Sequence, residues 1–314
     1  MIALPVHALR GSIPPLVTPF ADGRVDYDTY ACLVEHHVEA GSHGVVVCGT
    51  TGEPSVLTEA ERRQLAVVAI DAAGGRIEVI VASGSQSHAE TVALTEHAGA
   101  AGADAVLVVT PYYIKPPRRG LVAYFGDLAA RTDLPLLIYN IPGRAAVGVD
   151  IGVLTDIAEI APTFVGMKHA AADLTLVTEV MLAFGPEFRL LVGLEELSFP
   201  MLALGAAGMV NAVANVVPAK VVELYEAVTS DSIVTCRRLH QRLFELNRAV
   251  FFDTNPIPVK YMMWRLGLLP NFEHRLPMMP ATPELAARLD RVLLAAGLDF
   301  ATTSTTRKCS PSAP

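Results

Sequence analysis

The residues that could do chemistry in this chain start with a lysine at the end of an apolar run. Residues 164–167 read Phe-Val-Gly-Met, and Lys168 follows them, with His169 and three alanines next. An ammonium group buried without a partner is costly, so a lysine in such a place tends to lose its proton. The free amine can attack a carbonyl carbon and form a Schiff base, whose protonated form stabilises a carbanion on the adjacent carbon. Lys168 is therefore a candidate nucleophile for carbon–carbon bond chemistry.

Hydroxyl groups and one more cation follow other apolar runs of the sequence. These candidates are Thr50, Thr51, Tyr113, Tyr139 and Arg144. Phenol and hydroxyl groups can pass protons to and from a Schiff base. The flanking glycines of Thr50-Thr51 allow backbone N–H groups to face a carboxylate. This combination suits a 2-oxo acid as the substrate.

Each of these features also has an interpretation without catalysis. A lysine that ends a strand can extend its ammonium group to the surface, and Tyr112-Tyr113 can pack on the rim of a domain. The glycines around Thr50-Thr51 can serve a plain turn, and Arg144 can form a surface ion pair. The catalytic interpretation is favoured because all of these residues follow predicted strands and would meet on one rim.

Short apolar runs alternate with amphipathic stretches over most of the chain. The runs cover residues 13–18, 44–48, 77–82, 105–110, 135–140, 164–168, 190–193 and 208–213. Eight such alternations predict an α/β protein with a (β/α)8 TIM barrel, in which active sites lie at the carboxyl ends of the strands. A doubly wound open sheet is the alternative, but the first strand lacks the glycine-rich dinucleotide motif that follows it in many such folds.

Strand patterns stop near residue 232. Residues 234–252, 256–266 and 283–296 have helical patterns. We therefore predict a barrel over residues 9–231, a small C-terminal helical domain over 232–299 and a disordered tail over 300–314.

Composition excludes several classes of function. The net charge is −8 and basic residues do not cluster, so we expect no nucleic acid partner. No apolar run is long enough to span a membrane, and the N-terminus lacks a signal-peptide pattern. The four cysteines have no metal-ligand spacing, and we expect reduced thiols in a cytoplasmic protein.

Taken in order, the segments GTTGEPSVLT, TPYY, YNIPGR, GMK, NPIPVK and RLPMMP resemble the dihydrodipicolinate synthase / N-acetylneuraminate lyase family. The resemblance extends from about residue 13 to residue 297. It implies a TIM barrel with C-terminal helices, a homotetramer or at least a dimer, and no metal or organic cofactor. It also implies a pyruvate imine on Lys168.

The resemblance further implies a role for each site residue. Tyr139 would be the general acid/base, and Thr50 would relay protons to Tyr113, which usually reaches in from the neighbouring subunit. Thr51 would hold the pyruvate carboxylate, and Arg144 would bind the carboxylate of the second substrate, aspartate semialdehyde. Backbone carbonyls of Gly193 and Val210 would line the site, and Asn211 would lie near the second substrate.

Several positions depart from the pattern common in the synthases. His169 replaces a glutamate, and strand alternation places it away from the substrate. This chain has Gly193-Leu-Glu-Glu196 where the synthases commonly have Gly-Asp-Asp, and Asn211 replaces a small hydroxyl residue. Arg62 and Gln86 replace residues that often bind lysine as a feedback inhibitor, which puts that regulation in doubt.

These observations leave three functions open. The first is 4-hydroxy-tetrahydrodipicolinate synthase, which condenses pyruvate with aspartate semialdehyde. The second is a catabolic aldolase or hydratase-aldolase that cleaves a 4-hydroxy-2-oxo acid to pyruvate and an aldehyde. The third is a non-catalytic barrel that binds an oxo acid.

Overall fold

The computed structural model describes residues 2–300. Eight parallel strands form one sheet, in the order β1-β10-β9-β8-β7-β6-β5-β4. An isolated parallel bridge between Pro15 and Val46 joins the two edges of this sheet and closes it. The strands are β1 (Gly11–Ser12), β4 (Gly44–Val47), β5 (Glu78–Ala82), β6 (Ala105–Val109), β7 (Leu136–Asn140), β8 (Phe164–His169), β9 (Arg189–Val192) and β10 (Gly208–Met209). The predicted (β/α)8 barrel is confirmed.

The strands are apolar on both faces because each face is covered. Val46, Ile80, Leu107 and Leu137 fill the barrel interior, and their neighbours along the strands pack outward against helices. Such double burial is typical of a parallel sheet.

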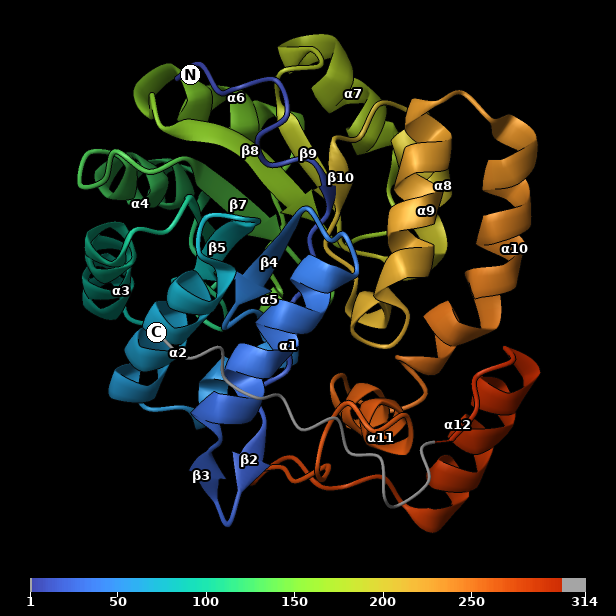
Figure 1. Cartoon of the computed structure of the whole chain (residues 1–314). Coiled ribbons are helices and arrows are strands. Elements are labelled where there is room, and N and C mark those ends of the chain that lie inside the picture. Colours follow the sequence, from blue (N-terminus) through green and yellow to red (C-terminus); the bar gives the residue numbers. More distant parts are fainter. Residues whose placement is uncertain (1, 301–314) are drawn as a thin grey trace.

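Helices surround the barrel in Figure 1. They are α1 (Tyr27–Glu39), α2 (Glu59–Ala73), α3 (His88–Ala101), α4 (Arg118–Ala129), α5 (Pro142–Ala145), α6 (Ile151–Ile160), α7 (Leu174–Phe184), α8 (Ser198–Ala203) and α9 (Pro218–Thr229). Helix α2 begins at the capping box that the sequence predicts, with Thr58 and Glu61 each bonding the backbone of the other. It ends at Gly74, whose φ of 55° is the left-handed value that favours glycine.

The first strand lies before the predicted run 13–18, and the last strand is shorter than the predicted run 208–213. Strand β1 ends at Ser12, before Pro14 and Pro15, because proline has no N–H to donate to a sheet. Strand β10 ends at Met209 and is followed by the 3-10 turn η4 (Ala212–Asn215). A small hairpin, β2 (Phe20–Ala21) and β3 (Arg24–Val25), follows β1.

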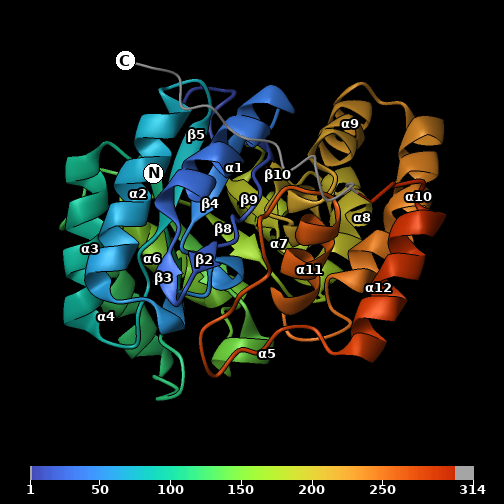
Figure 2. The ribbon, with the colours of Figure 1, turned by 60° about the horizontal axis from the view of Figure 1, so that its bottom comes forward.

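The C-terminal segment is helical, as predicted. Helix α10 (Ile233–Ala249) contacts α9 and α12 (Pro283–Ala295), and α11 (Ile257–Arg265) contacts α12 and η4 on the barrel (Figure 2). The domain boundary at 231/232 stays a prediction, and nearly all of the predicted tail lies outside the described residues. No helix within residues 2–300 is both long and apolar enough to cross a membrane.

The amino end of the barrel is sealed by the N-terminal segment. The buried Arg189 donates hydrogen bonds to the carbonyl oxygens of Pro5 and Ala8, at 3.0 and 2.8 Å. The Glu78 carboxylate accepts from the backbone N–H of Leu9 at 2.8 Å. The barrel interior is therefore accessible from the carboxyl end.

The register of β7 and β8 determines which side chains reach that end. A shift between Leu136 and Leu137 is followed by regular pairing of Tyr139 with Lys168 and of Asn140 with His169. Paired residues on neighbouring strands share a face of the sheet, and successive residues alternate between faces. Tyr139 and Lys168 therefore face the barrel interior together.

Candidate active site

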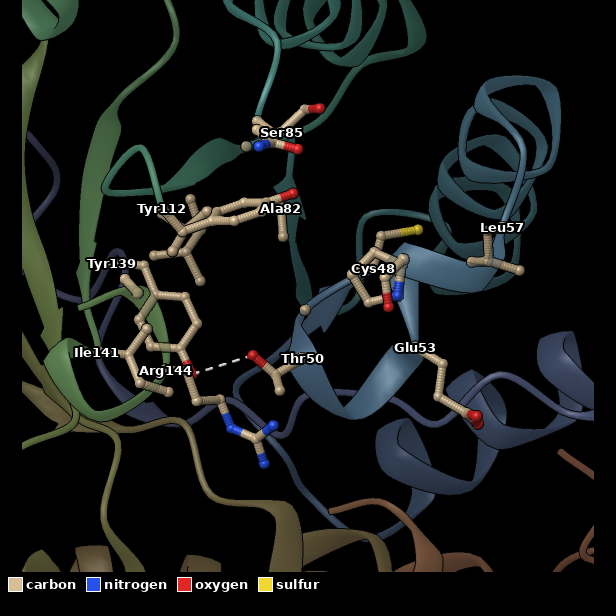
Figure 3. A pocket seen from close by; sticks show the side chains of 18 of the residues that line it. Cys48, Thr50, Glu53, Leu57, Ala82, Ser85, Tyr112, Tyr139, Ile141 and Arg144 are labelled. Atoms are coloured by element: carbon tan, nitrogen blue, oxygen red, sulfur yellow. Dashed lines mark hydrogen bonds between the residues drawn. The ribbon is translucent and has the colours of Figure 1, made fainter. Parts of the chain in front are cut away.

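Lys168, Tyr139 and Thr50 form the centre of the site. Lys168 is 4% exposed, and its Nζ lies 4.2 Å from the centroid of the Tyr139 ring. The Tyr139 hydroxyl is within hydrogen-bond distance, 3.3 Å, of Thr50 Oγ1 (Figure 3). Three residues that are far apart in the sequence thus lie together, with the amine over the phenol ring and the phenol oxygen beside the threonine hydroxyl.

Lys168 lies in a cavity of about 220 Å³ at the carboxyl end of the barrel. Of the residues that the sequence singles out, Thr50, Thr51, Tyr139, Arg144, Gly193 and Val210 line the same cavity. A small organic acid fits a space of this size. The structure thus brings together most of the predicted set.

Gly193 leaves room for the lysine side chain. A Cβ built on Gly193 would lie 2.9 Å from Lys168 Cε and 2.9 Å from Ala170 Cβ. Real Cβ atoms rarely approach other atoms so closely, so any larger residue would displace Lys168. The absence of a side chain at Gly193 therefore allows the Lys168 amine to occupy its position.

Arg144 lies on α5 at the mouth of the cavity. Its side chain is exposed and lines both the small cavity and a larger one of about 980 Å³. In Figure 3 its guanidinium group lies close to the Thr50–Tyr139 pair. An exposed cation at the mouth can contact an anionic group of an incoming substrate.

Glu195 is a buried acid that the predicted set omits. It is 2% exposed, lines the Lys168 cavity, and accepts a hydrogen bond from the backbone N–H of Ala212 at 2.5 Å. Its Oε2 atom is buried and has no hydrogen-bond partner in the part of the chain that the structure describes. Burial raises the pKa of this carboxyl to about 7, while backbone N–H groups and the charge of Lys168 lower it in part.

The side chains of Asn211 and His169 point away from the Lys168 cavity. The Asn211 side chain donates to Ser198 Oγ at 2.5 Å and does not line the small cavity, although its neighbours Val210 and Ala212 do. His169 is fully buried between Asn140, at 3.1 Å, and the carbonyl of Asp173, at 3.2 Å. His169 thus faces away from Lys168, as strand alternation predicts, whereas a role of Asn211 in binding stays a prediction.

Tyr113 lies outside the site of its own chain. It is 82% exposed, has a φ of 74°, and lines neither cavity. The structure therefore does not bring this tyrosine to Thr50 within one subunit.

The C-terminal segment also contributes residues that the predicted set omits. Asn255 and Phe251 line the cavity, and Asn255 Nδ2 donates to Thr51 Oγ1 at 2.9 Å. The NPIPVK segment contains Asn255, so the motif is the signal that could have identified it. The sequence marks Glu195 only as a departure from the synthase pattern after the seventh predicted strand, and its burial is what identifies it as part of the site.

The Lys168 amine, the Tyr139 phenol and the Thr50 hydroxyl lie together at the carboxyl end of a closed barrel. This arrangement is that of a barrel enzyme with a lysine at the centre of its active site. Comparisons with known proteins agree. Residues 8–296 match the model of the dihydrodipicolinate synthetase family.

Relatives with the same fold and length support this match. The chain is 44% identical over 290 residues to a 4-hydroxy-tetrahydrodipicolinate synthase of Thermus thermophilus, covering 92% of this chain and 97% of that protein. It is 39% identical to the enzyme of the same name from Nitratidesulfovibrio vulgaris, covering 92% and 99%. The crystal structure of dihydrodipicolinate synthase from Aquifex aeolicus superimposes with a TM-score of 0.91 at 38% identity, covering 93% of this chain and all of that one.

The chain belongs to the dihydrodipicolinate synthetase family. It is an enzyme, a lyase of the class I aldolase type, and not merely an oxo-acid-binding barrel.

Proposed function

We propose that the protein is a 4-hydroxy-tetrahydrodipicolinate synthase that condenses pyruvate with aspartate semialdehyde. The relatives from Thermus thermophilus and Nitratidesulfovibrio vulgaris carry that name. The observation that carries the chemistry is the buried Lys168 beside Tyr139, with Thr50 within hydrogen-bond distance of the phenol.

In this proposal the Lys168 amine attacks C2 of pyruvate, and the adduct loses water to form an iminium ion. The iminium withdraws electrons from C3, which loses a proton and becomes the nucleophile for the aldehyde. Tyr139 holds and moves the protons of these steps, and Thr50 relays them. The covalent imine is the only electron sink required, so the proposal includes no organic cofactor.

The same proposal assigns the binding groups. Thr51 holds the pyruvate carboxylate, and the carbonyl oxygens of Gly193 and Val210 face the substrate. Arg144 binds the carboxylate of aspartate semialdehyde from the cavity mouth, and Asn211 lies at the edge of that half of the site.

We also propose that the enzyme is a homotetramer, or at least a dimer, in which Tyr113 completes the proton relay of a neighbouring subunit. Its high exposure and its absence from the cavities of its own chain support this. A cytoplasmic location stays a prediction from the sequence.

A second candidate is a catabolic aldolase with the same pyruvate half-site. Leu194 and Phe251 give the cavity an apolar wall, and Asn211 turns toward Ser198. An aldehyde less polar than aspartate semialdehyde would fit such a wall.

Borohydride trapping with pyruvate, followed by mass spectrometry of the peptides, tests the imine. We expect an adduct on Lys168, no adduct in Lys168→Ala, and an unchanged adduct in Lys220→Ala, which alters an exposed lysine. Trapping on another lysine, or none at all, would contradict the proposal.

Turnover of pyruvate with aspartate semialdehyde then separates the two candidates. Rapid condensation supports the synthase, and trapping without condensation supports the catabolic aldolase. Arg144→Ala should raise KM for aspartate semialdehyde while leaving pyruvate trapping nearly unchanged, since Arg144 lies at the mouth. Equal loss of both would show that Arg144 serves the pyruvate half-site instead.

A further inference from the structure

A buried charged cluster lies beside the loop that carries Thr50 and Thr51. Its members are Glu53, Lys260 and His274, whose side chains are 2%, 1% and 0% exposed. Lys260 Nζ lies 2.6 Å from Glu53 Oε1, and His274 Nδ1 lies 3.0 Å from Glu53 Oε2. Each carboxylate oxygen thus lies within ion-pair distance of a different nitrogen.

The cluster connects parts of the chain that are far apart. Glu53 follows the 3-10 turn η1 (Thr50–Gly52), whereas Lys260 lies on α11 and His274 in the loop after it. Lys260 Nζ also donates to the carbonyl of Glu273 at 2.8 Å and lies 4.3 Å from the centroid of the Phe20 ring. The C-terminal segment therefore holds the end of the loop from the outside.

Charges in such a place call for an explanation, because taking two ions out of water costs more than burying apolar side chains of the same volume. Stability alone therefore does not account for them. A charged pair differs from an apolar contact in that it requires one geometry of its partners.

Glu53 is itself held in an uncommon backbone conformation. Its φ of 56° and ψ of 45° are left-handed, and its N–H donates to the carbonyl of Thr50 at 3.1 Å. Residues other than glycine rarely adopt this conformation unless their surroundings hold them there. In Figure 3 the Glu53 carboxyl group points away from the Thr50–Tyr139 pair, so it cannot act on that pair directly.

The rest of the loop is held by neutral hydrogen bonds. Asn255 Nδ2 donates to Thr51 Oγ1 at 2.9 Å, and Thr18 Oγ1 donates to the carbonyl of Gly52 at 2.7 Å. Among residues 2–300, the Thr50 hydroxyl has Tyr139 as its one side-chain hydrogen-bond partner, at 3.3 Å. The direction of the Thr50 hydroxyl therefore depends on how residues 51–53 are fixed.

We propose that Glu53, Lys260 and His274 are positioning residues, a clamp by which the C-terminal segment keeps the Thr50 hydroxyl in line with Tyr139. This inference rests on the proposed imine chemistry at Lys168. Displacement of a proton-carrying group by about 1 Å can cost about 10²-fold in rate. The clamp therefore acts on proton transfer and not on imine formation, since Lys168 belongs to β8 and no ion pair or hydrogen bond joins it to any of the three residues.

The experiment compares two reactions of pyruvate without any aldehyde. Borohydride trapping reports the imine, and exchange of the pyruvate methyl protons in D2O, followed by NMR, reports proton transfer at C3. We expect Glu53→Gln to keep trapping near the wild-type level and to slow methyl exchange by about 10²-fold.

Glu61→Gln is the matched control. Glu61 pairs with Arg275 at 2.7 Å and so also joins the barrel to the C-terminal segment, but it lies on α2 and not on the loop. We expect it to leave both readouts unchanged, even where it lowers Tm. If Glu53→Gln does not fold, the charge-free pair Glu53→Gln/Lys260→Met replaces it with the same expectation.

The outcomes separate the two proposals. If the folded Glu53 variant shows both imine trapping and methyl exchange at the wild-type level, the proposed clamp is wrong, whereas the imine chemistry is unaffected. Equal loss in Glu53→Gln and Glu61→Gln would also overturn it, because the effect would then follow general loosening of the C-terminal segment. No trapping in the wild type would overturn the proposed function, and the catalytic role of the clamp with it.

Discussion

At the scale of single residues, the buried acid beside the lysine has a consequence for stability. Burial raises the pKa of Glu195 from 4.5 to about 7, so the folded state binds the proton more tightly than the unfolded state does. The stability that this preference contributes is fully present below about pH 4.5 and is lost as the pH rises through about 7. The difference between the two pKa values corresponds to about 3 kcal/mol.

Glu195→Gln should remove this pH dependence, because the amide stays neutral at every pH. We expect the variant to gain stability relative to the wild type, by up to about 3 kcal/mol, between about pH 5 and pH 8. Urea unfolding at several pH values measures the difference, with the exposed Glu223→Gln as the control. A difference between variant and wild type that is constant over this range would refute the assignment.

At the scale of elements, the turn after β9 determines the space in which the Lys168 side chain lies. Gly193→Ala would place a Cβ 2.9 Å from Lys168 Cε. Because Gly193 does not have a left-handed φ, the substitution requires no unusual backbone conformation. The new Cβ would crowd Lys168 and the neighbouring Ala170, and Lys168 has the flexible side chain of the two. We expect a folded enzyme whose rate of imine trapping falls at least about tenfold.

Gly99→Ala on α3 is the control for that variant. Its Cβ would meet only Leu134, at 3.8 Å, and alanine is the better helix former by up to about 1 kcal/mol. Circular dichroism and Tm should show an equal or higher stability for Gly99→Ala, with unchanged trapping. Normal trapping in Gly193→Ala would show that the lysine can move aside without loss.

At the scale of the whole molecule, the exposed Tyr113 makes the proposed activity depend on the association of subunits. Tyr113→Phe should lower turnover by about 10²-fold, the usual contribution of a proton-transfer group. When Tyr113→Phe and Lys168→Ala subunits are expressed together, mixed assemblies contain sites with an intact lysine and a tyrosine from the other chain. We expect partial recovery of activity, measured against each variant alone, and no recovery would place Tyr113 in the site of its own subunit.

The sequence by itself determined the barrel, because its signal is local and repeated. Strands such as 105–109 and 136–140 are apolar on both faces, and the Thr58–Glu61 capping box marks where α2 begins. The same repetition shows which residues lie at or after the end of each strand. The sequence alone therefore places four of the candidate residues on one rim of the barrel: Lys168, Tyr139, Thr50 and Arg144. The prediction differs most from the structure at β1, which lies before the prolines and outside the predicted run 13–18, and at β10, which ends early and is followed by a 3-10 turn.

The tertiary structure alone decided which polar residues are buried and what they face. Nothing in the sequence indicates that Glu195 and Glu53 are buried. In the described part of the chain Glu195 lines the lysine cavity with no hydrogen-bond partner for Oε2, and Glu53 pairs with Lys260 and His274 of the C-terminal segment. Asn211 follows a strand as Val210 does, but its side chain turns to Ser198. These outcomes depend on contacts between residues that are up to about 220 positions apart, such as Glu53 and His274. A local sequence pattern does not specify such contacts, because the burial and pairing of polar side chains arise only when the segments pack together.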